Sequence, residues 1–281
     1  MLRQRVVTAL IAIAAALLAL WLLPTLVLAL LFGPLLLIGA WEWAVLAGLG
    51  WILRAVYVTA VAAALYGAWL GLETTPALVA FLGVSLCWWG VAAVAVMRYP
   101  AGLLPGGGAG GMVALAPLWR ALEGLLVLVP PFYVLLRLHA ASAAGALWIL
   151  SLLAFIWAAD TGAYFTGRAL GRTKLAPRVS PGKTWEGAIG GVLASVCVGA
   201  LLMRFGFHVR GASLAALMMV IAVVAVFSII GDLTISALKR GAGAKDSGTL
   251  FPGHGGVLDR LDSLFAAAPL FVLGLKILGL P

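Results

Sequence analysis

The sequence predicts an all-α integral membrane protein that forms a single domain over residues 1–281. Hydrophobic residues make up 64% of the chain and the mean hydropathy is +1.17, whereas soluble domains contain roughly 45–50% apolar residues. Charged residues make up only 10% of the chain. Nearly all of it consists of apolar runs close to the about 20 residues that a spanning helix needs. These three observations leave little sequence for a soluble domain.

Nine membrane-spanning helices are expected when Pro, Gly and charged clusters are taken as the boundaries between apolar runs. The expected spans are residues 7–23, 25–48, 52–72, 76–97, 114–136, 143–167, 186–204, 213–238 and 261–279. One long kinked helix through Pro24 is the alternative for the first two spans, and it would change the parity of the crossings. The glycine-rich segment 100–111 predicts a loop, because glycine destabilises a helix interior.

The distribution of Lys and Arg predicts the orientation of these spans, because cytoplasmic loops retain basic residues. With nine spans, 14 of the 18 basic residues fall on one side. The other side receives Arg137, Arg204, Arg210 and Lys276. We therefore expect a multi-pass protein of the inner (plasma) membrane with a cytoplasmic N-terminus. The two large polar loops, residues 168–185 and 239–260, would then face the cytoplasm, where nucleotides are available.

The net charge of +9 is expected to serve topology and attraction to anionic lipid headgroups, without a nucleic-acid partner. In the two polar loops, however, basic residues are interleaved with carboxylates, glycines and hydroxyls. Segment 236–263 alone contains three Asp, four Lys or Arg, one His and six Gly. This mixture suits the binding of phosphate and a metal ion together.

Carboxylates on two expected helices are candidate metal ligands. Asp232, Ser236 and Lys239 are spaced i, i+4, i+7, so a helix presents a carboxylate, a hydroxyl and an ammonium on one face. An Asp at the end of a long apolar run is costly unless it is paired, hydrated or bound to a cation, and an Asp–Lys ion pair is the structural alternative. Asp259 and Asp262 are spaced i, i+3 on a second helix. Mg²⁺ prefers one or two carboxylates completed by phosphates and water.

The glycines around His254 predict a turn that binds an anion. Gly253, Gly255 and Gly256 allow backbone N–H groups to point at one ligand, and an expected helix starts just after them. Lys239, Arg240 and Lys245 stand shortly before the turn in the sequence. A phosphate cradle is therefore favoured over a turn that only connects two helices.

The upstream loop contains a second polar group. Asp160 and Tyr164 are spaced i, i+4, and Arg168 marks the exit of this helix from the membrane. The G-K-T sequence at 182–184 is not a Walker A site, because Pro177 stands where that motif requires glycine and no strand pattern precedes it. The segment can still supply hydroxyl and ammonium groups to a phosphate, from Ser180, Lys183 and Thr184.

These motifs resemble those of one family. The stretch S-A-L-K-R-x4-K-D-S-G-x2-F-P-G-H-G-G-V-L-D-R-L-D-S at 236–263 resembles the signature of phosphatidate cytidylyltransferases, also called CDP-diacylglycerol synthases. D-T-G-A-Y-F-T-G-R and S-P-G-K-T-W-E-G are similar to two further segments of that family. The resemblance is specific over residues 157–264. Residues 1–140 match only as generic membrane helices, with a W-E-W around Glu42 that suits either a lipid entry groove or a helix end at the membrane interface.

The resemblance implies an enzyme that transfers the cytidylyl group of CTP to phosphatidic acid, giving CDP-diacylglycerol and pyrophosphate in phospholipid biosynthesis. CTP, phosphatidic acid and membrane lipids are the implied partners, together with a homodimer. Mg²⁺ is the implied cofactor, with one or two cations held by Asp232 and Asp259, and with Asp160, Asp246 and Asp262 as further candidate ligands. The implied catalytic residues are Lys239, Arg240, Lys245, Asp246, His254 and Asp262. The implied substrate-binding residues are Asp160, Tyr164, Arg168, Ser180, Lys183, Thr184, Ser236, Gly255, Gly256 and Arg260. His254 would either donate to the leaving pyrophosphate or hold the glycine turn.

Two other classes of function are compatible with parts of this sequence. A CTP-dependent lipid kinase or another membrane phospho-transfer enzyme would need the same metal, phosphate and bilayer chemistry. A CDP-alcohol phosphotransferase is disfavoured because its D-G-x2-A-R segment is absent from the sequence. A cation transporter or channel could use intramembrane carboxylates, but a cation path gains little from a basic, glycine-rich loop.

Overall fold

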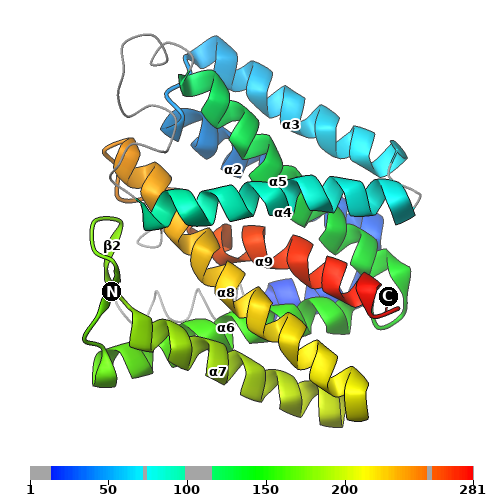
Figure 1. Cartoon of the computed structure of the whole chain (residues 1–281). Helices are drawn as coiled ribbons and strands as arrows, with labels where there is room; N and C mark the ends of the chain where they lie inside the picture. Colours follow the sequence, from blue (N-terminus) through cyan, green and yellow to red (C-terminus); the bar gives the residue numbers. More distant parts are fainter. Residues whose placement is uncertain (1–13, 72–74, 99–115, 252–254, 281) are drawn as a thin grey trace.

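The computed structural model describes residues 14–71, 75–98, 116–251 and 255–280, and it consists of long helices with one small sheet (Figure 1). Residues 14–22 are helical. The elements that follow are α2 (Thr25–Leu46), α3 (Trp51–Gly71), α4 (Thr75–Met97), α5 (Ala116–Ala141), α6 (Gly145–Leu170), β1 (Lys174–Ala176), β2 (Ser180–Thr184), α7 (Trp185–Leu201), the π-helical turn η2 (Leu202–Gly206), α8 (Gly211–Gly241) and α9 (Leu258–Ile277).

Seven helices among the described residues are long and apolar enough to cross a membrane. They are α2, α3, α4, α5, α6, α7 with η2, and α8. The expected spans from 25–48 to 213–238 are thus confirmed as helices. The first expected span, 7–23, is described only from residue 14, and the chain is helical from there to residue 22, so nine crossings remain a prediction.

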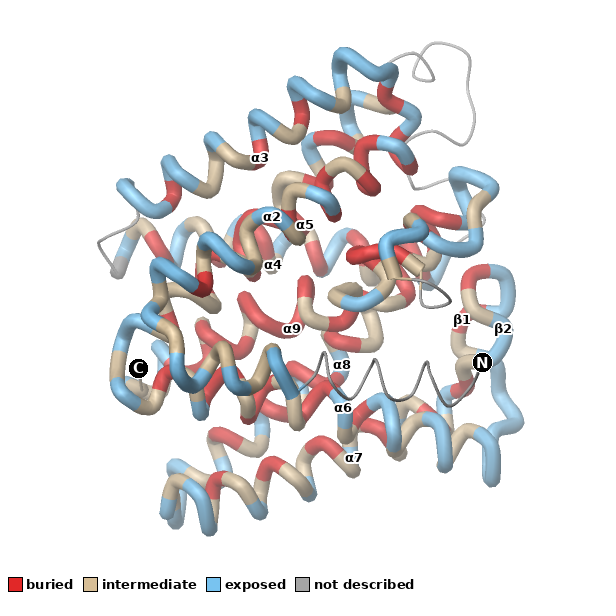
Figure 2. The backbone as a smooth tube through the Cα atoms, turned by 180° about the vertical axis from the view of Figure 1, so that it is seen from behind, coloured by how far each residue is buried: buried red, intermediate tan, exposed pale blue. Residues whose placement is uncertain are grey.

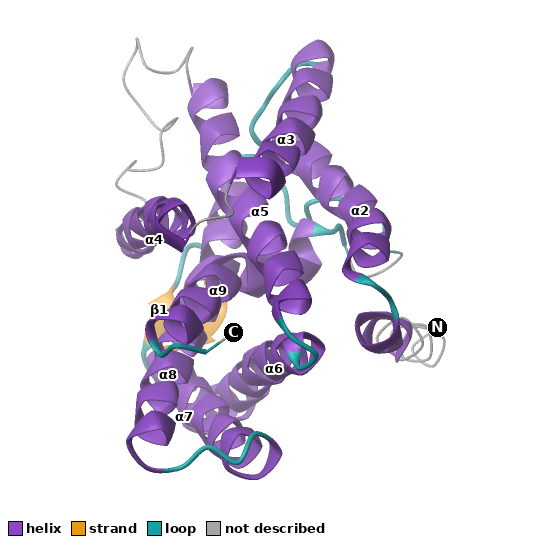
Figure 3. Ribbon diagram, turned by 90° about the vertical axis from the view of Figure 1, so that its right-hand side faces the viewer, coloured by secondary structure: helices purple, strands orange, loops and turns teal. Residues whose placement is uncertain are grey.

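Helix α9 lies in the centre of the bundle. It contacts α2, α4, α5, α6 and α8, and Figure 3 shows α4, α5, α6 and α8 around it. Much of its length is buried (Figure 2). Phe265 and Phe271 are among its buried side chains. Four charged residues in its sequence exclude it from the seven apolar helices. A helix enclosed by other helices is shielded from lipid, so polar residues at its start are tolerated there.

The segment between α6 and α7 forms a two-stranded antiparallel hairpin, which the helical prediction did not include. Lys174 pairs with Thr184 and Ala176 with Ser180. The expectation that no strand precedes the G-K-T sequence is therefore wrong, although β1 is only three residues long. Val179 and Ala176 are buried against α8 and the end of α4. This apolar contact fixes the hairpin on the helix that carries Asp232.

Helices α6 and α7 approach closely because α7 buries only small residues. Its buried positions are Gly187, Gly191, Ser195 and Gly199, one per turn. A side chain at Gly191 would collide with the backbone of α6. Small residues at every fourth position allow membrane helices to pack tightly in the absence of a hydrophobic driving force. The tight contact holds the polar end of α6 beside the hairpin.

Candidate active site

A cavity of about 530 Å³ lies at the end of the bundle near the hairpin, between α6, the hairpin, α7 and α8. Helices α6 and α8 end there and α7 and α9 begin there (Figure 1). The polar residues that line it are Asp160, Tyr164 and Arg168 from α6, Ser180, Lys183 and Thr184 from β2, and Asp232 from α8. The structure thus brings together seven residues that the sequence analysis proposed, from three segments.

The centre of the cavity holds an ion pair between two of its elements. The Nζ atom of Lys183 lies 2.6 Å from Oδ2 of Asp232, and both side chains are more than a quarter exposed. The hydroxyl of Ser236 donates to Oδ1 of Asp232 at 3.2 Å, as the i, i+4 spacing predicted. Asp160 also interacts electrostatically with Lys183 and Asp232. Asp232 therefore takes part in an Asp–Lys ion pair, as the structural alternative expected, and its partner is Lys183 of the hairpin.

The sequence around β2 turns the chain sharply into α7. The hydroxyl of Thr184 accepts a hydrogen bond from the N–H of Gly187 and caps the helix. The carboxylate of Glu186 accepts hydrogen bonds from the backbone of Arg172 and Thr173 at the start of the hairpin. Thr184 lines the cavity but is buried, and its oxygen is already engaged in the cap. Because Thr184 lines the cavity, its substrate-binding role stays a prediction.

A second polar group surrounds the start of α9, and it centres on Glu42 of α2. This side chain is only 6% exposed. One oxygen accepts the N–H of Val257 at 2.9 Å, and the other accepts the N–H of Leu258 at 3.0 Å and the hydroxyl of Ser247 at 2.8 Å. A negative charge at a helix N-terminus satisfies free N–H groups and complements the helix dipole. Glu42 thus anchors both α9 and the loop before it.

Asp259 belongs to the same group. Its Oδ2 atom accepts from the N–H groups of Ser247 and Gly256, at 2.8 and 2.9 Å. It also lies 3.0 Å from the Ser247 hydroxyl, whose single proton is shared between Asp259 and Glu42. Its Oδ1 atom accepts a hydrogen bond from the ammonium of Lys239 at 2.5 Å. Two backbone N–H groups thus orient the carboxylate, and its other oxygen is paired with an ammonium that is itself buried.

The predicted glycine turn does not leave its N–H groups free for an external anion. Gly255 has a φ of +81°, a conformation that favours glycine. The N–H of Gly256 points at the carboxylate of Asp259, so the anion that the turn holds here is a side chain of the protein. A Cβ at Gly256 would collide with the carboxylate of Glu42 and the hydroxyl of Ser247. His254 lies outside the described residues.

Asp262 links the two polar groups. It interacts electrostatically with Asp232, Lys183 and Lys239. Helices α8 and α9 approach each other closely near Asp262. A Cβ on Gly231 of α8 would collide with the backbone carbonyl of Asp262 on α9. The glycine therefore permits the two carboxylate-bearing helices to approach each other.

The remaining predicted residues lie at the end of α8, in the loop that follows it and in the first turn of α9. Arg240, Lys245, Asp246 and Arg260 are exposed, and Arg240 donates to the carbonyl of Ala244 at 3.2 Å. On α6, Arg168 donates to the hydroxyl of Tyr164 at 3.1 Å. Several cations are thus accessible near both polar groups and could meet a phosphate.

The site does not present a preformed metal cage: within the described ranges, no three His, Cys, Asp or Glu side chains are grouped as ligands. The donors nonetheless suit a hard cation. Asp232 is partly exposed in the cavity, and one oxygen of Asp259 is paired with the ammonium of Lys239. Mg²⁺ commonly takes one or two protein carboxylates and obtains its other oxygens from phosphates and water.

Comparison with known proteins covers nearly the whole chain. The cytidylyltransferase family matches residues 3–278. The phosphatidate cytidylyltransferase of Pseudomonas aeruginosa is 44% identical over 277 residues, which cover 96% of each chain. The phosphatidate cytidylyltransferase of Haemophilus influenzae is 37% identical over 287 residues, which cover 96% of this chain and 97% of the relative. That of Brucella suis is 53% identical over 125 residues, which cover 44% of this chain and 45% of the relative.

The family match and the full-length relatives agree with the resemblance that the motifs indicated. Together with the helices and the charged cavity at their end, they identify the chain as a member of the cytidylyltransferase family.

Proposed function

We propose that this chain transfers the cytidylyl group of CTP to phosphatidic acid, giving CDP-diacylglycerol and pyrophosphate. The observation that carries the proposal is the cavity that combines Lys183, Arg168, Asp160 and Asp232 at the end of membrane-spanning helices. A nucleotide from water and a phosphate on a bilayer lipid can both reach such a position. The relatives over the full length are named phosphatidate cytidylyltransferases, which supports the same substrates.

The reaction needs positioning and charge neutralisation rather than a covalent intermediate. A phosphate oxygen of phosphatidic acid attacks the α-phosphorus of CTP, and a new P–O bond forms as the bond to the β-phosphate oxygen breaks. Pyrophosphate leaves with that electron pair. A phosphate monoester is already largely dianionic near pH 7, so no side chain has to remove a proton. Held in line, the reactants gain from proximity and from fixed cations around the developing charge.

Two lysines and the arginines would provide those cations. Lys183 and Lys239 each neutralise a carboxylate in the structure. We expect them to turn toward phosphate groups when the nucleotide arrives, because a triphosphate carries more negative charge than one carboxylate. Arg240 and Arg260 are exposed near the start of α9 and suit bidentate contacts with phosphate oxygens. Lys245 and Asp246 are exposed in the loop between α8 and α9.

Magnesium is the proposed cofactor, held by Asp232 and Asp259, with Asp160 and Asp262 as supporting carboxylates. Bound Mg²⁺ would neutralise charge on the phosphates and could be joined by a second cation. The backbone N–H groups of Ser247 and Gly256 orient the carboxylate of Asp259, which would hold the Mg²⁺ ion. Asp232 is kept in place by Ser236.

The proposed topology has nine spans with the N-terminus and the site on the cytoplasmic side of the inner membrane. It rests on the bias of Lys and Arg toward the loops around the site. Single-cysteine accessibility labelling on the hairpin and at Arg210 would test it, since the two positions should be labelled from opposite sides. A homodimer is also proposed, and light scattering of the purified protein in detergent would measure it.

The direct test of function is incubation of the purified protein with phosphatidic acid, Mg²⁺ and CTP labelled at the α-phosphate. Label should enter the lipid, and pyrophosphate should appear in equal amount. Label that enters the lipid only from the γ-phosphate of CTP would instead identify a lipid kinase. Cation flux in proteoliposomes without any CTP-dependent lipid product would identify a transporter or channel.

The metal ligands can be tested with isosteric substitutions. Asp232→Asn and Asp259→Asn should abolish turnover while the protein remains folded and inserted in the membrane. Glu123→Gln, on α5, is the matched control, because it also removes a helical carboxylate but leaves the cavity intact. Near-normal Mg²⁺-dependent activity in purified Asp259→Asn would refute its assignment as a ligand.

A further inference from the structure

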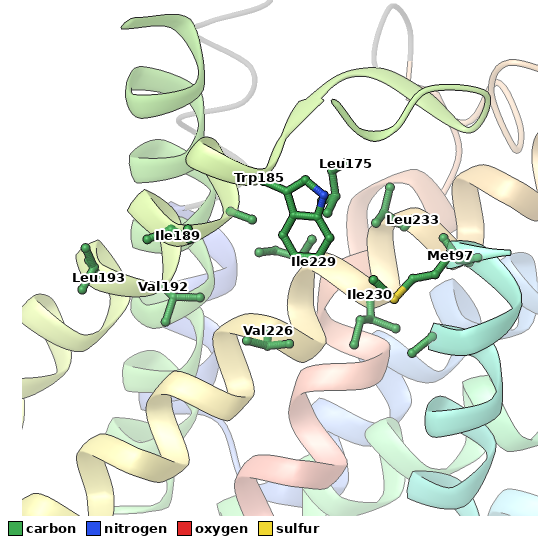
Figure 4. Close-up of a pocket in the computed structure, with 13 residues that line it drawn as sticks. Met97, Leu175, Trp185, Ile189, Val192, Leu193, Val226, Ile229, Ile230 and Leu233 are labelled. Atoms are coloured by element: carbon green, nitrogen blue, oxygen red, sulfur yellow. The ribbon is translucent and has the colours of Figure 1, made fainter. Parts of the chain in front are cut away.

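An apolar groove of about 340 Å³ lies beside the polar cavity (Figure 4). Its sides are α7 and α4, and its floor is α8, against which both of these helices pack. Ile189 and Leu193 project from α7, Val226 and Ile230 from α8, and Met97 from the end of α4 (Figure 4). All of the residues that line it are apolar or aromatic.

The groove and the polar cavity are continuous. Leu175, Ala188 and Ile229 line both. Trp185 lies at their junction, directly after the hairpin and one residue beyond Thr184 of the polar cavity (Figure 4). A molecule that fills both spaces would therefore have a charged group next to Lys183 and an apolar chain along α7 and α8.

The groove is accessible from the side of the bundle, within helices that are apolar enough to cross a membrane. Ile189 is 59% exposed, Leu193 60% and Val226 43%. From Trp185 to Leu193 the helix rises about 12 Å, and half of a bilayer's hydrocarbon core is about 15 Å thick. The groove thus follows α7 through most of the depth of one leaflet.

We infer that this groove holds one acyl chain of the phosphatidate substrate and thereby guides its phosphate into the polar cavity. This inference rests on the proposed function, because it assigns the lipid phosphate to that cavity. Lipid tails are as apolar as the groove, so burial of the chain contributes little affinity by itself. The groove would act by orientation: a chain fixed along α7 restricts where the phosphate can lie. Chain length and shape would then affect turnover, although the chemistry occurs at the headgroup.

A matched pair of substitutions on α8 tests the groove. Val226 and Val223 are nearly equally exposed, at 43% and 44%, but only Val226 lines the groove. Val226→Trp should lower kcat/KM for dioleoyl phosphatidate by about tenfold, the lower end of what a hydrophobic pocket achieves against a misfitting group. Dihexanoyl phosphatidate, whose chains are too short to reach this depth, should be used as well as by the wild type. The KM for CTP should not change, and Val223→Trp should behave like the wild type with both lipids.

Other outcomes would overturn the inference. Equal losses with long-chain and short-chain phosphatidate, or equal effects of Val223→Trp and Val226→Trp, would show that the groove does not select a chain. A change of oligomeric state in Val226→Trp alone would indicate that a second copy of the chain covers the groove.

A second measurement does not depend on turnover and so separates this inference from the proposed function. Phosphatidate with a photoreactive diazirine in one acyl chain should cross-link to peptides of α7 and α8 that line the groove. Phosphatidylcholine with the same chain should not, because its headgroup cannot occupy the cationic cavity. Equal labelling by both lipids would mean a non-selective lipid surface and would refute the inference. If the wild type formed no CDP-diacylglycerol, the proposed function would fail, while selective labelling by phosphatidate would still support the groove.

Discussion

Replacement of Glu42 by Gln should impair the enzyme, although this residue lies about 200 positions away in the sequence from the motif that it supports. The carboxylate accepts hydrogen bonds from Ser247, Val257 and Leu258 in a buried position. Gln has the same size but only one acceptor oxygen. Whichever oxygen is replaced, an NH₂ group then faces an N–H at the start of α9.

The cost follows from these contacts. A buried donor without an acceptor costs about 1–3 kcal/mol, and loss of a negative charge at a helix N-terminus costs about 0.3–1 kcal/mol. The total is about 1.3–4 kcal/mol. If half of that cost falls on the arrangement of Ser247 and Asp259, kcat/KM should fall by about tenfold, because each factor of ten corresponds to about 1.4 kcal/mol. The remainder should appear as a lower midpoint of thermal unfolding.

The assay is formation of CDP-diacylglycerol by purified Glu42→Gln protein, with thermal unfolding measured in the same detergent. Glu123→Gln is the control, since Glu123 interacts electrostatically with Arg120 on its own helix rather than with α9. Wild-type kcat/KM and an unchanged unfolding midpoint would refute the reasoning. A lower midpoint with unchanged kcat/KM would limit Glu42 to a structural cap.

Three further substitutions probe single contacts. Gly256→Ala should lower activity strongly, because its methyl group would displace Glu42; activity assays with the purified variant would show this, and wild-type activity would contradict the close approach. Thr184→Ala removes the cap on Gly187 and should lower the free energy of unfolding by about 1 kcal/mol, measured by denaturation in mild detergent, whereas Thr184→Ser should restore it. Gly191→Val should separate α6 from α7 and lower the unfolding midpoint more than the same change at Gly83, where a Cβ has no neighbour within 4 Å.

Hydropathy, with Pro, Gly and charged clusters as the boundaries, predicted most of the helices to within a few residues. The expected span 25–48 corresponds to Thr25–Leu46, and 186–204 corresponds to Trp185–Leu201 with the turn that follows. These boundaries follow from local composition, which the sequence displays directly. The start of α9 at Leu258 lies three residues before the expected span 261–279 but agrees with the helix expected just after the glycine turn. What the local sequence does not display is the cap on this helix by the distant Glu42. No local pattern near Leu258 indicates that cap.

The site was predicted only in part, because local spacing shows contacts within one helix but not contacts between separate elements. The i, i+4 spacing correctly indicated the contact between Ser236 and Asp232, and the family motifs grouped the residues of the cavity. The pairing of Asp232 with Lys183 joins α8 to the hairpin, and sequence spacing contains no information on contacts between separate elements. The hairpin itself was missed because its strands are short and Pro181 and Gly182 obscure any alternation. The W-E-W sequence was the only local signal of Glu42.

The contact between Glu42 and the start of α9 has a consequence for dividing the protein. The residues that resemble known cytidylyltransferase motifs lie between 157 and 264, yet the carboxylate that secures their last segment comes from α2. A fragment that contains only the C-terminal half would lack the hydrogen bonds to Glu42. It should be inactive even if it inserts into a membrane. Co-expression with a separate fragment that carries α2 to α5 should restore activity, and it should fail when that fragment carries Glu42→Gln. The described contact makes α2 part of the structure that holds the start of α9 and Ser247 in place, and not only a membrane anchor.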